Sequence, residues 1–388
     1  MSPARAPRPS LLRWLPLVLA LAWSGVVLAT GVTTEAWQPG YDLAVYRDGA
    51  RDLLAGADLY ERRTGRGHAF VYPPLAALLM LPLLLLPPTA ALVVWDVVLV
   101  LALLAAGGWL LRVAGLCARW RPAALALVVV SDPFRESLVL GQISPLVVLA
   151  LVAGVVLAGR GRPRTGALLA GLAGAVKVTP ALVVLLGAAR GWRRFAGWTV
   201  AAGVLLTAAG VAASPSALRS YLLGALWDSS RVAAPDTISN NSLAGAFSRA
   251  GLGDGTATAL GAGLSAVLVA VLVVLVVRAG HRTGRPGAGE RALHLGLAVS
   301  LLTCLASPVT WTHHALAAPL AALALARHRP VVAGLAGVPW LLPVLQQADA
   351  LGGVAGALLA QTRPLSLLVL LALTLRATAL RPSVTTDG

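Results

Sequence analysis

Residues 38–74 make up the first long polar break in the chain and read QPGYDLAVYRDGARDLLAGADLYERRTGRGHAFVYPP. They include four aspartates, five arginines and one glutamate, although a hydrophobic run directly precedes them. From Leu43 to Ala57 the apolar residues recur at helical spacing, whereas Arg47, Asp48 and Arg51 fall on the opposite side. The pattern predicts an amphipathic helix that lies on the outer surface of a membrane.

The chain around this break is strongly apolar. Of its 388 residues, 58% are hydrophobic and 12% are charged, whereas soluble domains carry about 25% charged residues. Apolar runs of bilayer-crossing length recur from Leu15 to the C-terminus, with short polar or Pro/Gly breaks between them. We therefore predict one all-α integral membrane domain over residues 1–388, a polytopic bundle of about 10–13 transmembrane helices.

Positive charge is confined to short clusters between the apolar runs. The formal net charge is +16, but apart from Trp192 the clusters lack the interleaved aromatic residues of nucleic-acid-binding surfaces, so we expect no nucleic-acid partner. The positive-inside rule instead places the clusters in the cytoplasm. The clusters lie at residues 5–13, 160–164, 190–194, 278–291, 327–329 and 376–381.

The same rule assigns the ends of the chain and the breaks between the clusters. Residues 1–14 and 382–388 are predicted to be cytoplasmic, and residues 32–73 to form the first extracytoplasmic loop. The other breaks then fall on the same outer face as this loop. They lie at Lys177 and at residues 214–249, 307–314 and 346–349.

Two points of topology stay open. In the interval 75–142, Pro87 and Pro88 split the apolar sequence while Arg112 and Arg119 favour the cytoplasm, so the sequence leaves the number of crossings undetermined. The N-terminal basic flank and apolar run also fit a cleaved signal peptide. The many spans that follow favour an uncleaved first helix instead.

Asp42 stands at the start of the predicted amphipathic helix, after Pro39 and Gly40. A carboxylate in this place is stabilised by free backbone N–H groups and by the helix dipole. From the residues alone, two interpretations stay open. Asp42 is either a plain N-cap or a carboxylate that functions at the membrane surface.

Lys177 interrupts an apolar segment that reads GLAGAVKVTPALVVLL (171–186). The short apolar runs on either side predict broken helices that meet near Lys177 and Pro180 and line a cavity. A charged amine in such a place costs about 3 kcal/mol unless it finds a partner. Lys177 therefore either binds an anionic ligand or snorkels to the outer interface as a structural lysine.

The segment SPVTWTHH (307–314) places His313 and His314 side by side between two apolar runs. Adjacent histidines point in different directions on a regular helix, which disfavours a shared zinc ion. Imidazoles that donate hydrogen bonds to a phosphate or a sugar hydroxyl need no such spacing, and ordinary interfacial histidines fit equally well. Cys117 and Cys304 are the only cysteines, so we expect neither a disulfide framework nor a thiolate metal cluster.

Two further breaks are rich in polar side chains. DTISNNSLAGAFSRA (236–250) contains Asn241 and Arg249 and suits a sugar or a phosphate, although a solvated loop with a helix cap explains it nearly as well. SDPFRESLVLGQISP (131–145) lies in the interval whose crossings are undetermined. It supplies Asp132, Arg135, Glu136 and Gln142.

Six motifs follow one another along nearly the whole chain. They are DLAVYRDGARDLLAGADLYE (42–61), FVYPPLAALLMLPL (70–83), GQISPLVVLAL (141–151), GLAGAVKVTP (171–180), NNSLAGAFSRA (240–250) and SPVTWTHH (307–314). Each motif is weak alone, but the ordered set resembles glycosyltransferase family 87, the integral-membrane, polyprenyl-phosphate-mannose-dependent mannosyltransferases of actinobacteria. The resemblance implies the GT-C architecture, a polytopic helical bundle whose first extracytoplasmic loop carries an amphipathic helix.

The resemblance also implies roles for individual residues. Asp42, in the first outer loop, would be the general base. The residues implied in binding the substrates are Lys177, His313, His314, Asn241, Arg249, Gln142 and Tyr46. The chain departs from the family pattern at Ile143, where the family tends to have Asn, and at Asn241, where it has Gln. These departures concern substrate specificity more than reaction type.

The implied reaction is direct displacement at the anomeric carbon of a polyprenyl-phosphate sugar. Mannose would pass to a mannoside, lipoglycan or glycolipid acceptor at the outer face of the plasma membrane, among its lipids. A carboxylate would take the proton of the acceptor hydroxyl while cations stabilise the departing phosphate, so we expect no metal and no other cofactor. A β-linked donor would give an α-linked product, expected to be α-(1→2).

Other functions stay open. The donor could carry another sugar, for example arabinofuranose, because GT-C enzymes share this layout. A lipid or polysaccharide transporter would also have broken helices and a buried lysine, but the sequence shows no matching pair of interrupted segments in two halves. A non-catalytic assembly subunit is disfavoured by Asp42 and the amphipathic loop around it.

Overall fold

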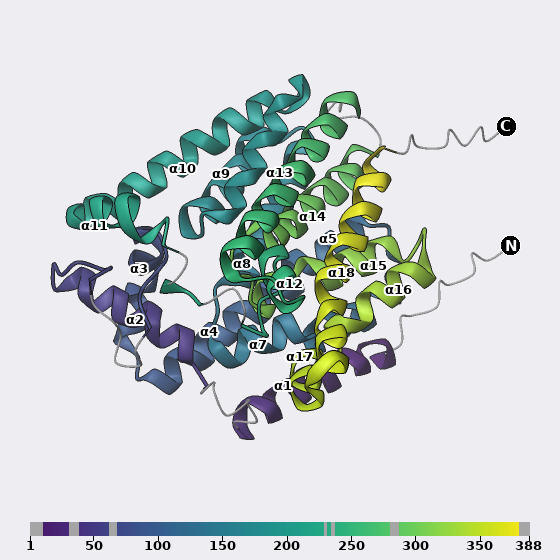
Figure 1. Cartoon of the computed structure of the whole chain (residues 1–388), viewed down its shortest axis with the longest axis horizontal. Helices are drawn as coiled ribbons and strands as arrows, with labels where there is room; N and C mark the ends of the chain where they lie inside the picture. Colours follow the sequence, from purple (N-terminus) through teal and green to yellow (C-terminus); the bar gives the residue numbers. More distant parts are fainter. Residues whose placement is uncertain are drawn as a thin grey trace, which may run out of the picture.

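The computed structural model of the chain describes residues 11–30, 39–61, 68–228, 231–233, 237–279 and 287–379. The described residues form α-helices and short 3₁₀- and π-helical turns, and no β-strand occurs among them. The helices lie side by side in one bundle (Figure 1). The predicted all-α membrane fold is therefore confirmed.

The first nine α-helices lead from the N-terminus to Lys177. They are α1 (Leu15–Thr30), α2 (Tyr41–Leu54), α3 (Pro74–Met80), α4 (Pro88–Ala102), α5 (Gly108–Val113), α6 (Arg121–Val130), α7 (Asp132–Leu140), α8 (Ser144–Gly159) and α9 (Pro163–Val176). Proline stands in the first turn of α3, α4 and α6 to α9. A proline starts a helix readily there because its missing N–H would have no partner within the helix.

The second half of the chain continues in the same way. Its helices are α10 (Arg193–Ala213), α11 (Pro215–Ser220), α12 (Leu243–Arg249), α13 (Asp254–Ala279), α14 (Ala288–Ala306), α15 (Ala317–Leu325), α16 (Pro330–Gly337), α17 (Val344–Leu351) and α18 (Gly353–Ala379). The short turns are η1 (Leu11–Trp14), η2 (Leu81–Leu85), η3 (Leu103–Gly107), η4 (Thr179–Ala188), η5 (Arg190–Trp192), η6 (Tyr221–Ala225), η8 (Thr312–Ala315) and η9 (Val338–Trp340).

Four segments within the described residues are long and apolar enough to cross a membrane. They are Pro88–Val113, Arg190–Ala213, Asp254–Ala279 and Gly353–Thr378. A fifth candidate is the pair Pro330–Trp340 and Val344–Leu351, which is bent by 65°. Six other apolar helices are shorter, with 10–17 residues. The expected number of about 10–13 crossings thus requires shorter helices to take part.

Hydrogen bonds between distant residues show that the chain repeatedly leaves one end of the bundle and returns to it. Gln142 Nε2 donates to the Tyr72 hydroxyl (3.2 Å), and Lys177 Nζ donates to the Ser144 hydroxyl (3.1 Å). The two ends of the interval 75–142 therefore meet in one network of hydrogen bonds.

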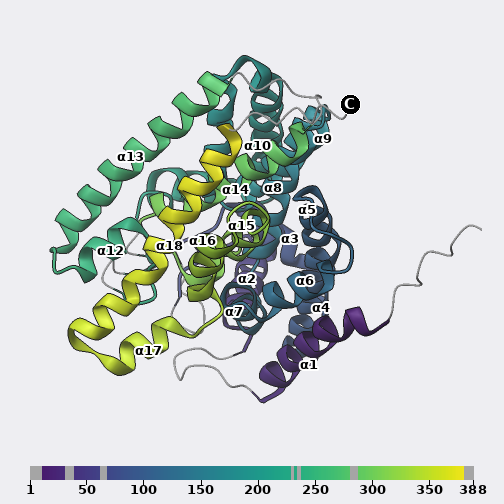
Figure 2. The ribbon, with the colours of Figure 1, turned by 90° about the vertical axis from the view of Figure 1, so that its right-hand side faces the viewer.

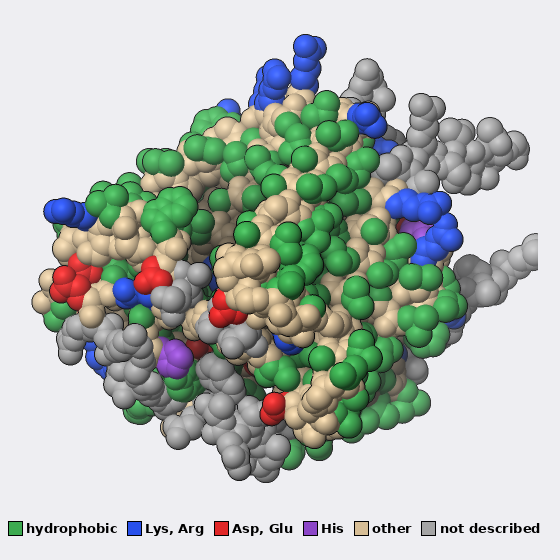
Figure 3. Space-filling view, in the orientation of Figure 1, with side chains coloured by type: hydrophobic (Ala, Val, Ile, Leu, Met, Phe, Trp, Pro, Cys, Tyr) green, Lys and Arg blue, Asp and Glu red, His purple; other side chains and the backbone are tan. Residues whose placement is uncertain are grey.

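The arginine clusters lie where these excursions turn back. Residues 160–164 join α8 to α9, whose other ends carry Ser144 and Lys177. Residues 190–194 comprise η5 and the start of α10. Figure 3 shows the largest groups of Lys and Arg at the upper edge and on the right, while the Asp and Glu of this face lie toward the left and the bottom. This separation agrees with the predicted charge asymmetry.

The predicted amphipathic helix is present as α2, but other elements cover it. It packs against α3, η2 and α7, and its buried residues include Leu43, Tyr46 and Ala50. Arg47, expected on the polar face, is only 5% exposed and donates to the Leu86 carbonyl (2.7 Å). Leu54, expected on the apolar face, is exposed. The neighbouring elements thus bury part of the polar face as well.

Several predicted features lie outside the described residues. These include Asp236, most of the predicted cytoplasmic ends, residues 280–286 of one arginine cluster and parts of the loop 32–73. Figure 2 shows α1 and α13 on opposite edges of the bundle, with α8, α14 and α15 between them.

Candidate active site

Two glycines with left-handed backbone bring the start of α2 against the end of α7. Gly40, which precedes α2, has φ 71° and donates its N–H to the Val139 carbonyl (2.7 Å). Gly141, which follows α7, has φ 69°. A Cβ at Gly141 would lie 2.6 Å from Leu43 Cβ, too close for any other residue. This close approach places Asp42 beside Gln142, 100 positions along the chain.

Asp42 is not the N-cap of α2. The cap position belongs to Gly40, and Asp42 stands in the first helical turn. Its carboxylate oxygen Oδ2 accepts a hydrogen bond from Gln142 Nε2 (3.0 Å). The N-cap interpretation is therefore wrong.

Gln142 is the centre of a buried polar network. Its Oε1 accepts from the Tyr46 hydroxyl (2.7 Å) and from the Ser144 hydroxyl (3.1 Å). Its Nε2 donates to Asp42 and to the Tyr72 hydroxyl. Gln142 is only 1% exposed, so these partners satisfy the hydrogen-bonding needs of a buried amide. The network fixes the orientation of the Asp42 carboxylate.

Lys177 lies at the predicted break. α9 ends at Val176, Lys177 has extended backbone, and the 3₁₀ turn η4 starts at Thr179. Lys177 Nζ donates to the Ser144 hydroxyl and lies 5.7 Å from the centre of the Tyr72 ring. The Ser144 hydroxyl in turn bonds Gln142, so Lys177 joins the network that holds Asp42.

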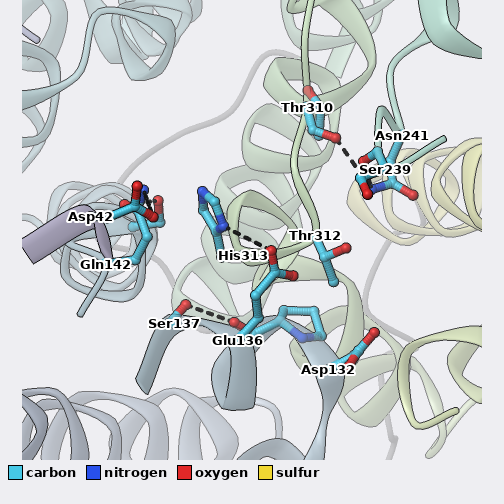
Figure 4. A network of polar contacts seen from close by, with 12 residues as sticks. Asp42, Asp132, Glu136, Ser137, Gln142, Ser239, Asn241, Thr310, Thr312 and His313 are labelled. Atoms are coloured by element: carbon cyan, nitrogen blue, oxygen red, sulfur yellow. Dashed lines mark hydrogen bonds and ion pairs between the residues drawn. The ribbon is translucent and has the colours of Figure 1, made fainter. Parts of the chain in front are cut away.

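The two histidines sit in the turn η8, which packs against α7. Their rings meet edge to face with centres 4.5 Å apart. His313 Nδ1 lies 3.2 Å from Glu136 Oε1 on α7. Figure 4 shows the His313 ring between Glu136 and the pair formed by Asp42 and Gln142.

A cavity of about 300 Å³ joins these side chains. Five of the predicted residues line it, namely Asp42, Gln142, Lys177, His313 and His314. Tyr46 does not line it but supports Gln142 from behind. Apolar residues form much of the remaining wall. Among the described residues, no group of three or more His, Cys, Asp or Glu side chains could hold a metal ion.

Asn241 and Arg249 are not among the residues that line this cavity. Asn241 is fully buried, and both its backbone N–H (2.7 Å) and its Nδ2 (3.2 Å) donate to the Thr310 carbonyl. It therefore ties its loop to the segment that leads into η8. Arg249 donates to the Asn240 carbonyl and lines a separate cavity of about 220 Å³ with Asp349.

Sequence reasoning overlooked three contributors to the site. Tyr72 and Ser144 lie inside recognised motifs but were not singled out, and the structure makes them partners of Gln142. Glu136 was noted only as part of a polar break, yet it bonds His313, 177 positions away. The signal available for all three was a polar side chain next to an apolar run.

Burial dominates the electrostatics around Asp42. It raises the pKa of the Asp42 carboxyl above its usual value, while His313 and the hydrogen bond from Gln142 act in the opposite direction. Burial likewise raises the pKa of Tyr72 to about 12, with Asp42 adding to the effect. A carboxylate with a raised pKa is a better proton acceptor, which is the property a general base needs.

Comparison with known proteins identifies similar sequences. Residues 70–308 match the family model described as glycosyltransferase family 87. The chain is 32% identical over 332 residues to a polyprenol-phosphate-mannose-dependent alpha-(1-2)-phosphatidylinositol pentamannoside mannosyltransferase of Mycolicibacterium smegmatis, covering 79% of this chain and 77% of the relative. The Mycobacterium tuberculosis protein of the same name is 32% identical over 79% of this chain and 73% of the relative. A phosphatidylinositol mannoside mannosyltransferase of M. smegmatis, with the same donor and linkage in its name, is 29% identical over 77% and 74%.

Proposed function

This chain belongs to glycosyltransferase family 87, and on that basis we propose that it transfers mannose from polyprenyl-phosphate-mannose to a mannoside acceptor. The proposal extends to a lipoglycan or glycolipid acceptor, an α-(1→2) linkage formed with inversion, and a site on the outer face of the plasma membrane. The observation that carries it is the cavity in which Asp42 shares one space with Lys177, His313 and His314. The names of the mycobacterial relatives support the donor and the linkage.

Asp42 is the general base of the proposed reaction. The acceptor hydroxyl oxygen attacks the anomeric carbon and its proton passes to the Asp42 carboxylate. The bond from the anomeric carbon to the phosphate oxygen breaks, and its electron pair stays on that oxygen. Because the attack comes from the face opposite the phosphate, a β-linked donor gives an α-linked product.

Lys177 and His314 are the proposed partners of the donor phosphate. The phosphate of the donor carries one negative charge and gains a second when the sugar leaves. Cationic or N–H donor groups that are already in place stabilise this developing charge without reorganisation. Lys177 is held by Ser144 at the same cavity, which supports such a preorganised role.

The surroundings of the cavity suit a donor with a lipid tail. The wall of the cavity includes the apolar residues Val178, Leu226 and Val232. A polyprenyl chain needs contact with apolar surface, whereas its sugar and phosphate need polar partners. A cavity that carries both kinds of wall supports reaction at the boundary between lipid and water.

The proposed outer location rests on the charge distribution. The arginine clusters of residues 160–164 and 190–194 lie at the turns away from Lys177 and Ser144. Arginine-rich loops stay on the cytoplasmic side, so the cavity end is assigned to the outside.

The test is a transfer assay with the purified full chain in nanodiscs. The protein is incubated with synthetic polyprenyl-phosphate-mannose and a set of mannosides, and the products are identified by mass and linkage analysis. We expect an acceptor extended by one α-(1→2)-linked mannose. The same assay with polyprenyl-phosphate-arabinofuranose tests the donor sugar.

Two outcomes would overturn the proposal. Transfer of arabinofuranose but not mannose would assign another donor to the same site. Movement of labelled lipid-linked sugar across the bilayer of a liposome without any transferred product would identify a transporter.

A further inference from the structure

We propose that Glu136 is a positioning residue that acts on the transfer reaction through His313. The inference rests on the proposed function, because it concerns how the same cavity handles the departing phosphate. Glu136 turns His313 so that Nε2 faces the cavity and Nδ1 faces α7. His313 thereby becomes a directed partner for the leaving group rather than a freely rotating ring.

The contacts of His313 define which nitrogen is free. Nδ1 lies 3.2 Å from Glu136 Oε1. A carboxylate only accepts hydrogen bonds, so Nδ1 carries the hydrogen in this pair. His313 is only 3% exposed and lines the cavity. Its Nε2 atom is buried and has no hydrogen-bond partner among the described residues. A buried, unpartnered ring nitrogen at a cavity points to a ligand that completes its hydrogen bonding.

A second set of contacts holds the backbone next to His313. Asp132, on the same helix as Glu136, accepts a hydrogen bond from the fully buried Arg363 of α18. Arg363 Nη1 also donates to the Thr312 hydroxyl (2.9 Å). Thr312 directly precedes His313 in η8 (Figure 4). The bonds of Arg363 to Asp132 and Thr312 therefore let α7 and α18 together fix the turn that carries the ring. Other residues thus hold the backbone of η8, and the contact with Glu136 sets the rotation of the His313 ring.

The environment of His313 contains charges of both signs. Glu136 of α7 and Asp42 of α2 are the carboxylates near the ring, and His314 of η8 and Lys177 are the basic groups. As the bond between the anomeric carbon and the phosphate oxygen breaks, the phosphate gains a full negative charge. In the form with a hydrogen on both ring nitrogens, His313 donates from Nε2 to that charge, and the Glu136 carboxylate stabilises the cationic ring from the opposite nitrogen. His313 forms and breaks no covalent bond in this step.

Glu136→Gln tests this role because it keeps the size of the side chain and removes its charge. We expect kcat at saturating donor and acceptor to fall about tenfold or more, since groups in direct contact couple strongly. The donor KM should change less than about twofold, because the missing interaction strengthens only as charge develops. A protein with a misplaced η8 would instead show a raised donor KM and a lowered unfolding temperature.

A double-mutant cycle with His313→Ala separates an effect through the ring from a direct one. In the His313→Ala background, Glu136→Gln should change kcat by less than about twofold, because the group it acts on is gone. The single variant Glu136→Gln with the parent kcat would overturn the proposal. A full and multiplicative effect of Glu136→Gln on top of His313→Ala would overturn it as well.

The chain offers a matched control at the other end of the bundle. Glu290 Oε1 lies 3.3 Å from His328 Nε2, a pair with the same chemistry that does not line the cavity. Glu290→Gln should leave kcat and both KM values within about twofold of the parent. Different results would refute the proposed function and the role of Glu136. A parent protein that does not transfer mannose would refute the proposed function. An active parent protein whose Glu136→Gln variant has the same kcat would refute only the role of Glu136.

Discussion

The hydrogen bonding and the pKa of Asp42 depend on residues of other elements more than on its own helix. In the first turn of α2 its carboxylate lies near the positive end of the helix dipole, but its hydrogen-bond partner is Gln142, which lies far along the chain. Burial raises the pKa of Asp42 while His313 lowers it. Asp48, on the same helix, is instead paired with Arg51 and does not line the cavity.

Asp42→Asn should lower turnover by about 10²–10⁴, the usual loss when a general base is removed. Asparagine keeps the size and the oxygen that accepts from Gln142, but it cannot take the acceptor proton. The donor Kd should stay close to that of the parent. Initial rates and donor binding in nanodiscs check both expectations.

Asp48→Asn is the matched control for this substitution. Asp48 lies on the same helix, is paired with Arg51 and is absent from the cavity wall. Its turnover should stay within a few-fold of the parent. If Asp42→Asn turned over at the parent rate, or lost donor binding together with folding, Asp42 would be structural.

The raised pKa of Asp42 predicts the acid limb of the pH profile. The base works in its ionised form, so activity is present above the pKa and is lost as the pH falls through it. The limb of kcat/KM for the acceptor should therefore lie above pH 3.8, the pKa of an ordinary aspartate. Gln142→Leu removes a hydrogen bond that lowers the pKa, so it should move the limb to higher pH. A limb that stays in place in this variant would contradict the assignment of the base.

At the scale of elements, glycines set how closely α8 and α9 approach. A Cβ at Gly166 of α9 would lie 2.2 Å from the Gly154 carbonyl oxygen of α8, and a Cβ at Gly154 would lie 2.5 Å from the Gly166 oxygen. Small residues allow helix backbones to meet in this way within a membrane. Because α8 starts at Ser144 and α9 ends beside Lys177, this crossing positions two members of the site.

Gly166→Ala should lower the unfolding temperature and raise the donor KM. The added methyl group meets backbone atoms that cannot move aside, and overpacking of this kind costs about 1–3 kcal/mol. Separation of α8 and α9 should also pull Lys177 away from Ser144. Thermal unfolding in nanodiscs and the donor KM are the measurements.

Gly197→Ala on α10 controls for the change of residue type. A Cβ at Gly197 would meet nothing within 4 Å, so alanine should be neutral or stabilise the helix by up to about 1 kcal/mol. If the Gly166→Ala and Gly197→Ala variants had equal unfolding temperatures and donor KM values, the α8–α9 crossing would tolerate a methyl group.

At the scale of the whole molecule, charge is distributed unevenly between the two ends of the bundle. The cavity and Asp42 belong to one end and the arginine cluster at residues 160–164 to the other, and Figure 1 shows α17 at the end opposite the turn from α8 to α9. The positive-inside rule assigns the arginine end to the cytoplasm. The orientation of the site thus depends on the loops and not on the site itself.

Impermeant thiol labelling of intact cells measures this orientation. In a background with the exposed Cys117 replaced by serine, Asp349→Cys should react in intact cells, whereas Arg162→Cys should react only after the membrane is opened. Both positions are exposed, so access differs only by side. The reverse pattern would place the cavity in the cytoplasm and refute the proposed location.

The local features of the site were predictable from the sequence. An all-α membrane bundle follows from apolar runs of bilayer length, because a chain in lipid must satisfy its backbone hydrogen bonds within each segment. The break at Lys177 follows from a charge and a proline within an apolar run. Asp42, Lys177, His313 and His314 stand out because polar side chains in such surroundings are costly unless they have a partner.

Long-range contacts decided which side chains meet at the site, and no local sequence pattern specifies these contacts. The bonds from Gln142 to Asp42 and Tyr72, and from His313 to Glu136, join residues that lie 70 to 177 positions apart. Arg249 stands in a polar segment of the same kind as Gln142, yet the fold places it at a separate cavity. The sequence by itself determined which residues need partners, because the cost of burying a polar group depends on its immediate surroundings. Only the tertiary structure determined which partners they have, because that depends on how the helices between them turn back and pack.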